Sequence, residues 1–305
     1  VDQHREEFLQ AWRRAVQQPG ISAHNTGIEE AARVTQAILD GAGFTTRLLP
    51  TRGAPVVFGE ARAGSQGDDE RNRALTILIY GHYDVQPPDP LEHWTSPPFE
   101  PTVRDGRLYG RGSADNKGQH LAHVFGVRTL RDVEGLPVNV KIILEGEEEV
   151  GSPHLAEFVR DHRDELAADL VITSDGPQGP NGEPMIILGV RGILSFELIA
   201  RGAAWDNHSG NKGNIAPNPA WRLVEILSRL RAPDGTVQIP GFYDAVRSPD
   251  DIEEKFLEAL PFDRESVARI IGVPVDMLAN LDGPTYYRRL TLEPSFTING
   301  MISGY

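Results

Sequence analysis

The sequence has 305 residues, of which 39% are hydrophobic, so it can bury a large core in one big domain or two ordinary ones. Its 30 basic and 44 acidic side chains give a net charge of −14, which disfavours nucleic acid and anionic membrane surfaces as partners. It has no cysteine, which excludes disulfides, cysteine nucleophiles and thiolate metal sites, so any metal ion must be held by histidine and carboxylates.

Three features concern the location of the protein. The first residues, 1–7, lack the basic and then apolar order of a signal peptide, and no apolar run has the length of a membrane span. The absence of cysteine agrees with a reducing compartment. We therefore expect a cytoplasmic protein.

Strand and helix patterns alternate through the first 175 residues. The predicted elements, in chain order, are helices over 3–18 and 27–42, strands over 45–49, 55–59 and 75–80, a hairpin over 103–109, a helix over 116–132, a strand over 138–144, a helix over 152–166 and a strand over 169–173. We expect a capping box at Thr26 and Glu29, and a cap at Ser152. The alternation predicts an α/β fold with a mixed, largely parallel sheet flanked by helices.

The character of the sequence changes at residues 189–192, where a new alternating strand is predicted over 193–200 and a helix over 217–230. We therefore expect one domain over 1–190 and a smaller α+β domain over 191–305. Within the first domain, the proline-rich segment 87–101 excludes a helix or a central strand. It predicts a stiff loop over the end of the strand at 75–80.

The strand at 75–80 ends on Gly81 and is followed at once by His82 and Asp84. Residues two apart in an extended segment point the same way, so this carboxylate can fix the tautomer of the imidazole while the other ring nitrogen binds a metal. The alternative is a histidine that is only hydrogen-bonded in the structure. Other residues of the chain are needed to distinguish a metal-binding histidine from one that is only hydrogen-bonded.

Other predicted strands of the first domain also run into acidic residues at their carboxyl ends. These residues are Glu145 to Glu149 after the strand at 138–144 and Asp175 after the strand at 169–173. Acidic clusters at one edge of a sheet repel each other unless a cation lies among them. One imidazole with several carboxylates suits Zn, Mn or Co. A solvated charge run is the alternative for Glu147 to Glu149, and a helix cap is the alternative for Asp115.

Five segments occur in the order in which the co-catalytic di-metal peptidases carry their motifs. They are YGHYDVQP at 80–87, LYGRGSADNKG at 108–118, EGEEEVGS at 145–152, TSDG at 173–176 and NHSG at 207–210. The sequence therefore resembles the di-zinc aminoacylase, carboxypeptidase and dipeptidase family. The stretch after His82, the Trp94 loop and the glutamate pattern look most like its carnosinase-type dipeptidase branch.

The resemblance implies two divalent metal ions, Zn before Mn or Co. Asp115 would bridge both ions, His82 and Asp175 would complete the ligands of the first, and Glu149 would bind the second. The resemblance also implies a cis peptide bond between Asp115 and Asn116. In the family the second ion takes a further histidine from near the carboxyl end, and the last histidine here is His208.

The resemblance also implies catalytic roles. Glu148 matches the general base that takes a proton from a metal-bridging water, Glu147 matches a spacer, and Asp84 would orient His82. His208 matches a histidine of the smaller lid domain that reaches into the neighbouring site of a homodimer and binds the oxyanion. A loop histidine without function is the alternative for His208, and Asn207 stands where the family more often has an apolar residue.

The resemblance implies a metal-dependent hydrolase that cleaves the amide bond of dipeptides or short peptides. The first rival is an N-acyl-amino-acid deacylase of the acetylornithine deacetylase or succinyl-diaminopimelate desuccinylase kind, which would take an N-acyl amino acid. The second is a non-catalytic binding protein on the same fold. We further expect residues 191–305 to be an incomplete lid, because the lid of the family continues further and the chain then returns to the first domain.

Overall fold

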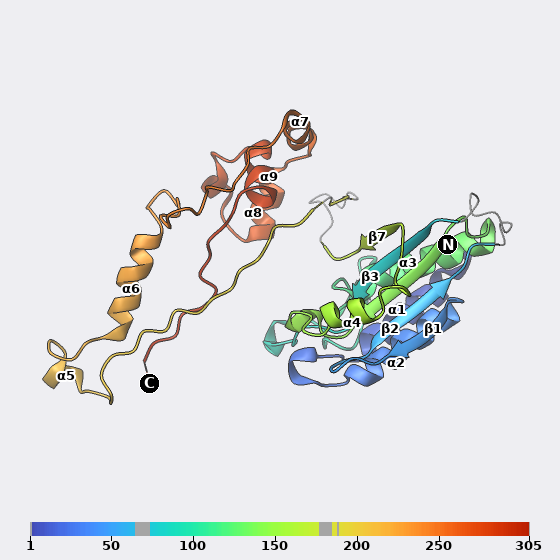
Figure 1. Cartoon of the computed structure of the whole chain (residues 1–305), viewed down its shortest axis with the longest axis horizontal. Helices are drawn as coiled ribbons and strands as arrows, with labels where there is room; N and C mark the ends of the chain where they lie inside the picture. The colour runs from blue at the N-terminus through green and yellow to red at the C-terminus, as the bar shows by residue number, and fades with distance from the viewer. Residues whose placement is uncertain (1, 65–73, 177–184, 188, 305) are drawn as a thin grey trace. The chain divides into compact units, whose positions relative to one another are not determined.

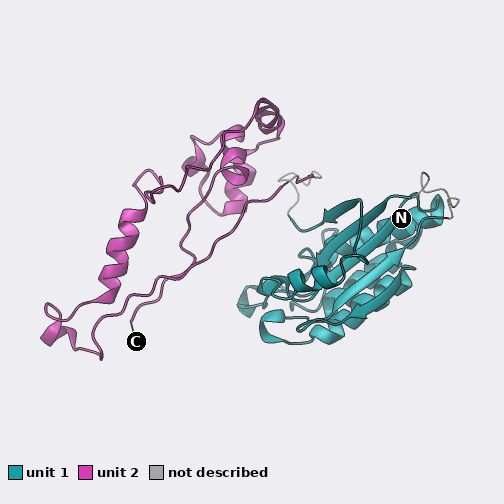
Figure 2. Cartoon of the chain, in the orientation of Figure 1, with its two compact units in different colours: residues 1–177 teal, residues 178–305 magenta. Residues whose placement is uncertain are grey.

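The computed structural model describes residues 2–64, 74–176, 185–187 and 189–304. The chain divides into two compact units, residues 1–177 and residues 178–305 (Figure 2). The assignment of residues 1–190 to a catalytic domain and 191–305 to a lid stays a prediction.

The first unit holds all the strands of the described part of the chain (Figure 1). Its strands are β1 Thr45–Leu49, β2 Val56–Ala61, β3 Thr76–His82, β4 Thr102–Arg104, β5 Arg107–Tyr109, β6 Asn139–Glu145 and β7 Leu170–Thr173. Its helices are α1 Arg5–Gln17, α2 Ile28–Gly41, α3 Lys117–Val133 and α4 Leu155–Asp161, with short 3-10 turns η1 Asp2–His4, η2 Ser22–His24, η4 Leu91–His93 and η5 Glu148–Val150.

The main sheet has five strands in the order β1-β2-β6-β3-β7. β3 runs parallel to both β6 and β7, whereas β2 runs antiparallel to β1 and β6. The predicted mixed sheet flanked by helices is therefore confirmed. Because β3, β6 and β7 are parallel, their carboxyl ends lie at one edge of the sheet, where open α/β sheets bind ligands.

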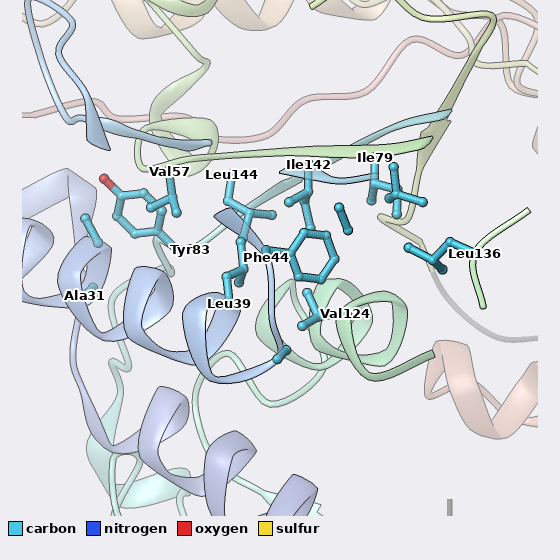
Figure 3. Packing of buried hydrophobic residues seen from close by; sticks show 14 of the residues in the cluster. Ala31, Leu39, Phe44, Val57, Ile79, Tyr83, Val124, Leu136, Ile142 and Leu144 are labelled. Carbon is cyan, nitrogen blue, oxygen red and sulfur yellow. The ribbon is translucent and has the colours of Figure 1, made fainter. Parts of the chain in front are cut away.

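Alternation along the strands divides the core between the two faces of the sheet. On one face, Leu144 and Ile142 of β6 point towards Leu39 of α2 and Val124 of α3 (Figure 3). The intervening residue Ile143 packs on the other face with two strand neighbours and a residue of α4, namely Phe58, Leu78 and Phe158. Helices thus cover both faces and leave the strand ends as the open edge.

Two predicted helix caps are wrong. Gly27, with φ of 67°, is the N-cap of α2 and no side chain caps the helix, while the Thr26 hydroxyl donates to the His24 carbonyl. The Ser152 hydroxyl donates 2.8 Å to the buried Glu145 carboxylate, and α4 begins three residues later. A nearby acceptor thus competes with the capping interaction, which sequence spacing cannot show.

The regular elements among the described residues of the second unit are helices, joined by long segments without regular structure. Its helices are α5 Ser209–Lys212, α6 Pro219–Leu230, α7 Asp251–Ala259, α8 Arg264–Ile271 and α9 Gly283–Thr291, with the 3-10 turn η6 Val275–Leu278. The strand predicted over 193–200 is not formed, and its apolar side chains Ile193 and Leu194 are exposed. The prediction was wrong because an alternating pattern becomes a strand only when a partner strand accepts its hydrogen bonds. In the described part of the chain, no helix combines the length and apolarity that a membrane crossing needs.

Candidate metal centre

Four of the predicted ligands or catalytic groups come together at the open edge of the sheet, namely His82 and three carboxylates. His82 ends β3 and its side chain is completely buried. Its Nε2 atom lies 3.1 Å from an Asp115 carboxylate oxygen, 3.6 Å from Asp175 and 3.9 Å from Glu148. These carboxylates come from the loop before α3, the end of β7 and the turn after β6. Tertiary folding thus places one imidazole nitrogen against three acidic side chains.

The other ring nitrogen of His82 faces Asp84, which is also fully buried. The Nδ1 atom lies 3.2 Å from the Asp84 carboxylate and 3.1 Å from the Asp84 backbone carbonyl. With its proton on Nδ1, where Asp84 offers two acceptors, the neutral ring presents Nε2 as the ligand atom. The same carboxylate accepts hydrogen bonds from the backbone N–H groups of Glu148, at 3.3 Å, and Glu149, at 3.1 Å. Asp84 therefore contacts both His82 and the turn that carries the glutamates.

The three adjacent glutamates point to different partners. A carboxylate oxygen of Glu147 lies 2.8 Å from the Nδ1 atom of His154, so Glu147 pairs with this histidine and not with His82. Glu148 approaches His82, whereas Glu149 accepts a 2.7 Å hydrogen bond from the amide of Gln86. A solvated charge run would leave all three pointing outwards. Glu147 is the N-cap of the 3-10 turn η5, which contains Glu148 and Glu149 and is held by the Asp84 carboxylate, so the three side chains leave the chain in different directions.

The electrostatics of the edge favour a cation at Nε2. Burial alone lowers the pKa of His82, but the hydrogen bond and charge of Asp84, together with Glu148 and Asp175, outweigh it and raise the pKa to about 9. Burial raises the pKa of Glu148, and Asp175 and Glu149 raise it further, while His82 opposes them. Burial likewise raises the pKa of Glu149, against the hydrogen bond from Gln86. The carboxylates thus repel each other and stabilise positive charge between them.

The donor set fits a divalent metal ion. Two groups of three side chains each have ligand atoms within 4.8 Å of one another, namely His82 with Asp115 and Asp175, and His82 with Glu148 and Glu149. Over residues 2–64 and 74–176, no lysine or arginine forms an ion pair with these carboxylates. One imidazole with carboxylates suits Zn, Mn or Co. A divalent metal ion can therefore supply the positive charge that no lysine or arginine side chain of this part of the chain provides to these carboxylates.

Asp115 does not cap the helix that follows it. The N-cap of α3 is Asn116, without a side-chain cap, and the Asp115 carboxylate turns to His82 instead. The peptide bond between Asp115 and Asn116 is cis, as the resemblance implied. His208 belongs to the second unit, where it is exposed and its Nδ1 atom accepts from the Gly210 N–H at 3.1 Å. The structure therefore places His208 only within its own unit.

Sequence reasoning missed two polar residues of this edge. Gln86 donates to the Glu149 carboxylate, and Asn116 is completely buried between strand ends. Both belong to the quoted motifs, at 80–87 and 108–118, and this was the only signal available for them. Their partners are distant in sequence, so spacing could not assign them a contact.

This fold and this edge define an α/β protein with a histidine and carboxylate centre that suits a divalent metal ion. The chain belongs to the peptidase family M20/M25/M40, whose sequence profile matches residues 78–290. The predicted family is thereby confirmed.

The chain is similar to several named dipeptidases. It is 29% identical to the Cys-Gly metallodipeptidase dug1 of Schizosaccharomyces pombe over 289 residues, which cover 91% of this chain and 60% of that protein. It is 36% identical to the Beta-Ala-His dipeptidase of Rattus norvegicus over 220 residues, which cover 71% of this chain and 43% of that protein. The chain therefore spans 60% or less of the length of these two relatives.

Among solved structures, the chain is similar to the M20 family metallo-carboxypeptidase Sso-CP2 from Sulfolobus solfataricus. The TM-score is 0.83 at 33% identity, and the match covers 98% of this chain and 66% of that one. The similarity extends the family assignment from the sequence to the fold.

Proposed function

We propose that the protein is a metal-dependent peptidase that hydrolyses the amide bond of dipeptides or short peptides. The observation that carries this proposal is the position of the His82 Nε2 atom against the Asp115, Asp175 and Glu148 carboxylates. Membership of the peptidase family and similarity to two proteins named as dipeptidases support it.

In this proposal His82, Asp115 and Asp175 would hold one divalent ion, and Asp115 and Glu149 would hold a second. Zn is the first candidate, with Mn and Co as alternatives. When bound there, a divalent ion would supply Lewis-acid chemistry, polarising the scissile carbonyl and lowering the pKa of the attacking water.

Glu148 serves as the general base and then as the general acid. Its carboxylate takes a proton from the attacking water as the new C–O bond forms at the carbonyl carbon. The same carboxyl then gives that proton to the amine nitrogen as the C–N bond breaks. Burial raises the pKa of Glu148, and this direction agrees with the exchange, because a raised pKa makes the carboxylate a better proton acceptor in the first step.

Further parts of the proposal concern the whole protein. Residues 1–190 would form the catalytic domain and residues 191–305 part of a lid, through which the protein forms a homodimer in the cytoplasm. His208, exposed before α5, would then supply an oxyanion contact to the partner site. The resemblance of residues 207–210 to the family motif supports this part.

A substrate panel tests the proposed function. The full-length protein, loaded with Zn²⁺ or Co²⁺, should hydrolyse dipeptides and lose that activity when a chelator removes the metal. N-acetyl amino acids form the second half of the panel. Faster cleavage of N-acetyl amino acids than of any dipeptide would identify a deacylase instead, and binding without cleavage of either class would identify a binding protein.

We expect the 305-residue chain to bind one Co²⁺ ion tightly. Both candidate ligand groups need the Nε2 atom of His82, and Nδ1 faces Asp84, so the described residues offer one imidazole ligand to a single ion. A second ion would have only carboxylates. A Co²⁺ titration followed by visible absorption should therefore show one tight equivalent and a much weaker second one. Two equivalents of equal affinity would contradict this ligand count.

A further inference from the structure

Asn116 connects the ends of the two strands that deliver His82 and Asp175. Its side chain is completely buried. The carbonyl oxygen of its amide accepts a hydrogen bond from the His82 backbone N–H at 3.2 Å, and its amide NH₂ donates to the Ser174 carbonyl at 2.7 Å. Ser174 directly precedes Asp175, and Asp115 directly precedes Asn116. The Asn116 amide thus contacts the backbone of His82 and of the residue before Asp175, and Asn116 itself follows Asp115 in the chain. It is therefore connected to three proposed metal ligands.

The amide acts where the backbone ladder stops. The pairing of β3 with β7 ends at Tyr80 and Thr173, one residue short of Ser174 and two short of His82. Beyond that point the Asn116 side chain links the end of β3 to the segment after β7, in place of backbone hydrogen bonds. An amide suits this place because it carries a donor and an acceptor together, which a carboxylate or an apolar side chain does not.

Gly81 leaves the space that the amide occupies. A Cβ atom on Gly81 would lie 2.6 Å from the Asn116 amide oxygen, closer than real Cβ atoms approach an oxygen. It would also lie 3.1 Å from a methyl group of Leu144. The glycine before His82 thus allows the amide to lie directly against β3.

We propose that Asn116 is a positioning residue that sets the separation of the His82, Asp115 and Asp175 segments and thereby the metal affinity of the centre. The inference rests on the proposed function, since it assumes that these three side chains bind one ion. Asn116 itself does not contact the metal in this assignment. It acts by holding the backbone that carries the ligands.

Co²⁺ alone is the probe that tests this inference, and no substrate is needed. In Asn116→Ala, Co²⁺ affinity should fall by about 10- to 100-fold, the usual loss when a partner that orients metal ligands is removed. The visible spectrum of the bound Co²⁺ should also change, because the ligands no longer keep their arrangement.

Asn139 provides a matched control at the other end of the same sheet. It begins β6, its amide oxygen accepts from the Ala63 N–H at 3.0 Å, and its NH₂ donates to the Ala74 carbonyl at 3.4 Å. Asn139→Ala removes the same kind of link and should lower thermal stability without changing Co²⁺ affinity or the spectrum. An equal loss of Co²⁺ affinity in both variants would show that Asn116 supports the fold only.

Gly81→Ala tests the same point while every polar group stays in place. It should weaken Co²⁺ binding by displacing the Asn116 amide, and it decides the matter if Asn116→Ala does not fold. Unchanged Co²⁺ affinity in a folded Asn116→Ala or Gly81→Ala chain would overturn the inference. Failure of the unaltered chain to bind Co²⁺ would instead overturn the proposed metal centre.

Discussion

Glu148→Gln will reduce peptide hydrolysis by about 10²- to 10⁴-fold, the usual contribution of a general acid or base. Glutamine has nearly the same shape as glutamate but cannot accept the proton of the attacking water. Of the three carboxylates that face the His82 Nε2 atom, Glu148 is the most distant, at 3.9 Å. Metal content should therefore stay close to that of the unaltered protein. The measurement is kcat on a dipeptide together with metal analysis of the same sample.

The two neighbouring glutamates are matched controls for this substitution. Glu147→Gln should keep most of the activity, because Glu147 pairs with His154 and is absent from both candidate ligand groups. Glu149→Gln should instead weaken the binding of one ion. If Glu148→Gln kept full turnover, or if Glu147→Gln lost it, the base would be assigned to the wrong glutamate. Loss of metal in Glu148→Gln would make Glu148 a ligand.

His82→Gln will abolish tight metal binding. Both candidate ligand groups contain His82, and it is their only imidazole, so no group of three remains after the substitution. Catalytic zinc usually keeps three protein ligands. We expect Co²⁺ affinity to fall by more than about 100-fold, beyond the loss typical of removing a partner outside the ligand set. Activity should fall with it, because no ion remains to polarise the carbonyl.

His120 is the control for this second substitution. It is nearly as buried as His82 and belongs to α3, but it is absent from both candidate ligand groups. Burial strongly disfavours its charged form and lowers its pKa to about 3. His120→Gln should destabilise the fold without loss of metal affinity. Retention of Co²⁺ by His82→Gln would place the metal elsewhere, and an equal loss of Co²⁺ in His120→Gln would show that the effect of His82→Gln is not specific to a ligand.

The sequence by itself predicted most of the sheet and the edge on which the centre lies. Buried strands are short apolar runs, and the runs over 75–80 and 138–144 correspond to β3 and β6. Since parallel strands end at one edge, the polar residues that follow them were expected together. His82, Asp175 and Glu148 are found there. The Asp-Gly turn of the hairpin also followed from sequence, because Asp105 and Gly106 both have positive φ.

Only the tertiary structure decided which polar group meets which. Three glutamates in a row are equivalent in sequence, and the hydrogen bonds of Asp84 to the turn separate their directions. The Ser152 hydroxyl donates a hydrogen bond to Glu145 and does not cap a helix. The Asn116 amide forms hydrogen bonds with the backbone of His82 and Ser174. Hydrophobic periodicity is a local property of the chain and therefore determines elements. Hydrogen bonds between residues that are distant in sequence depend on how those elements pack, and they determine the site.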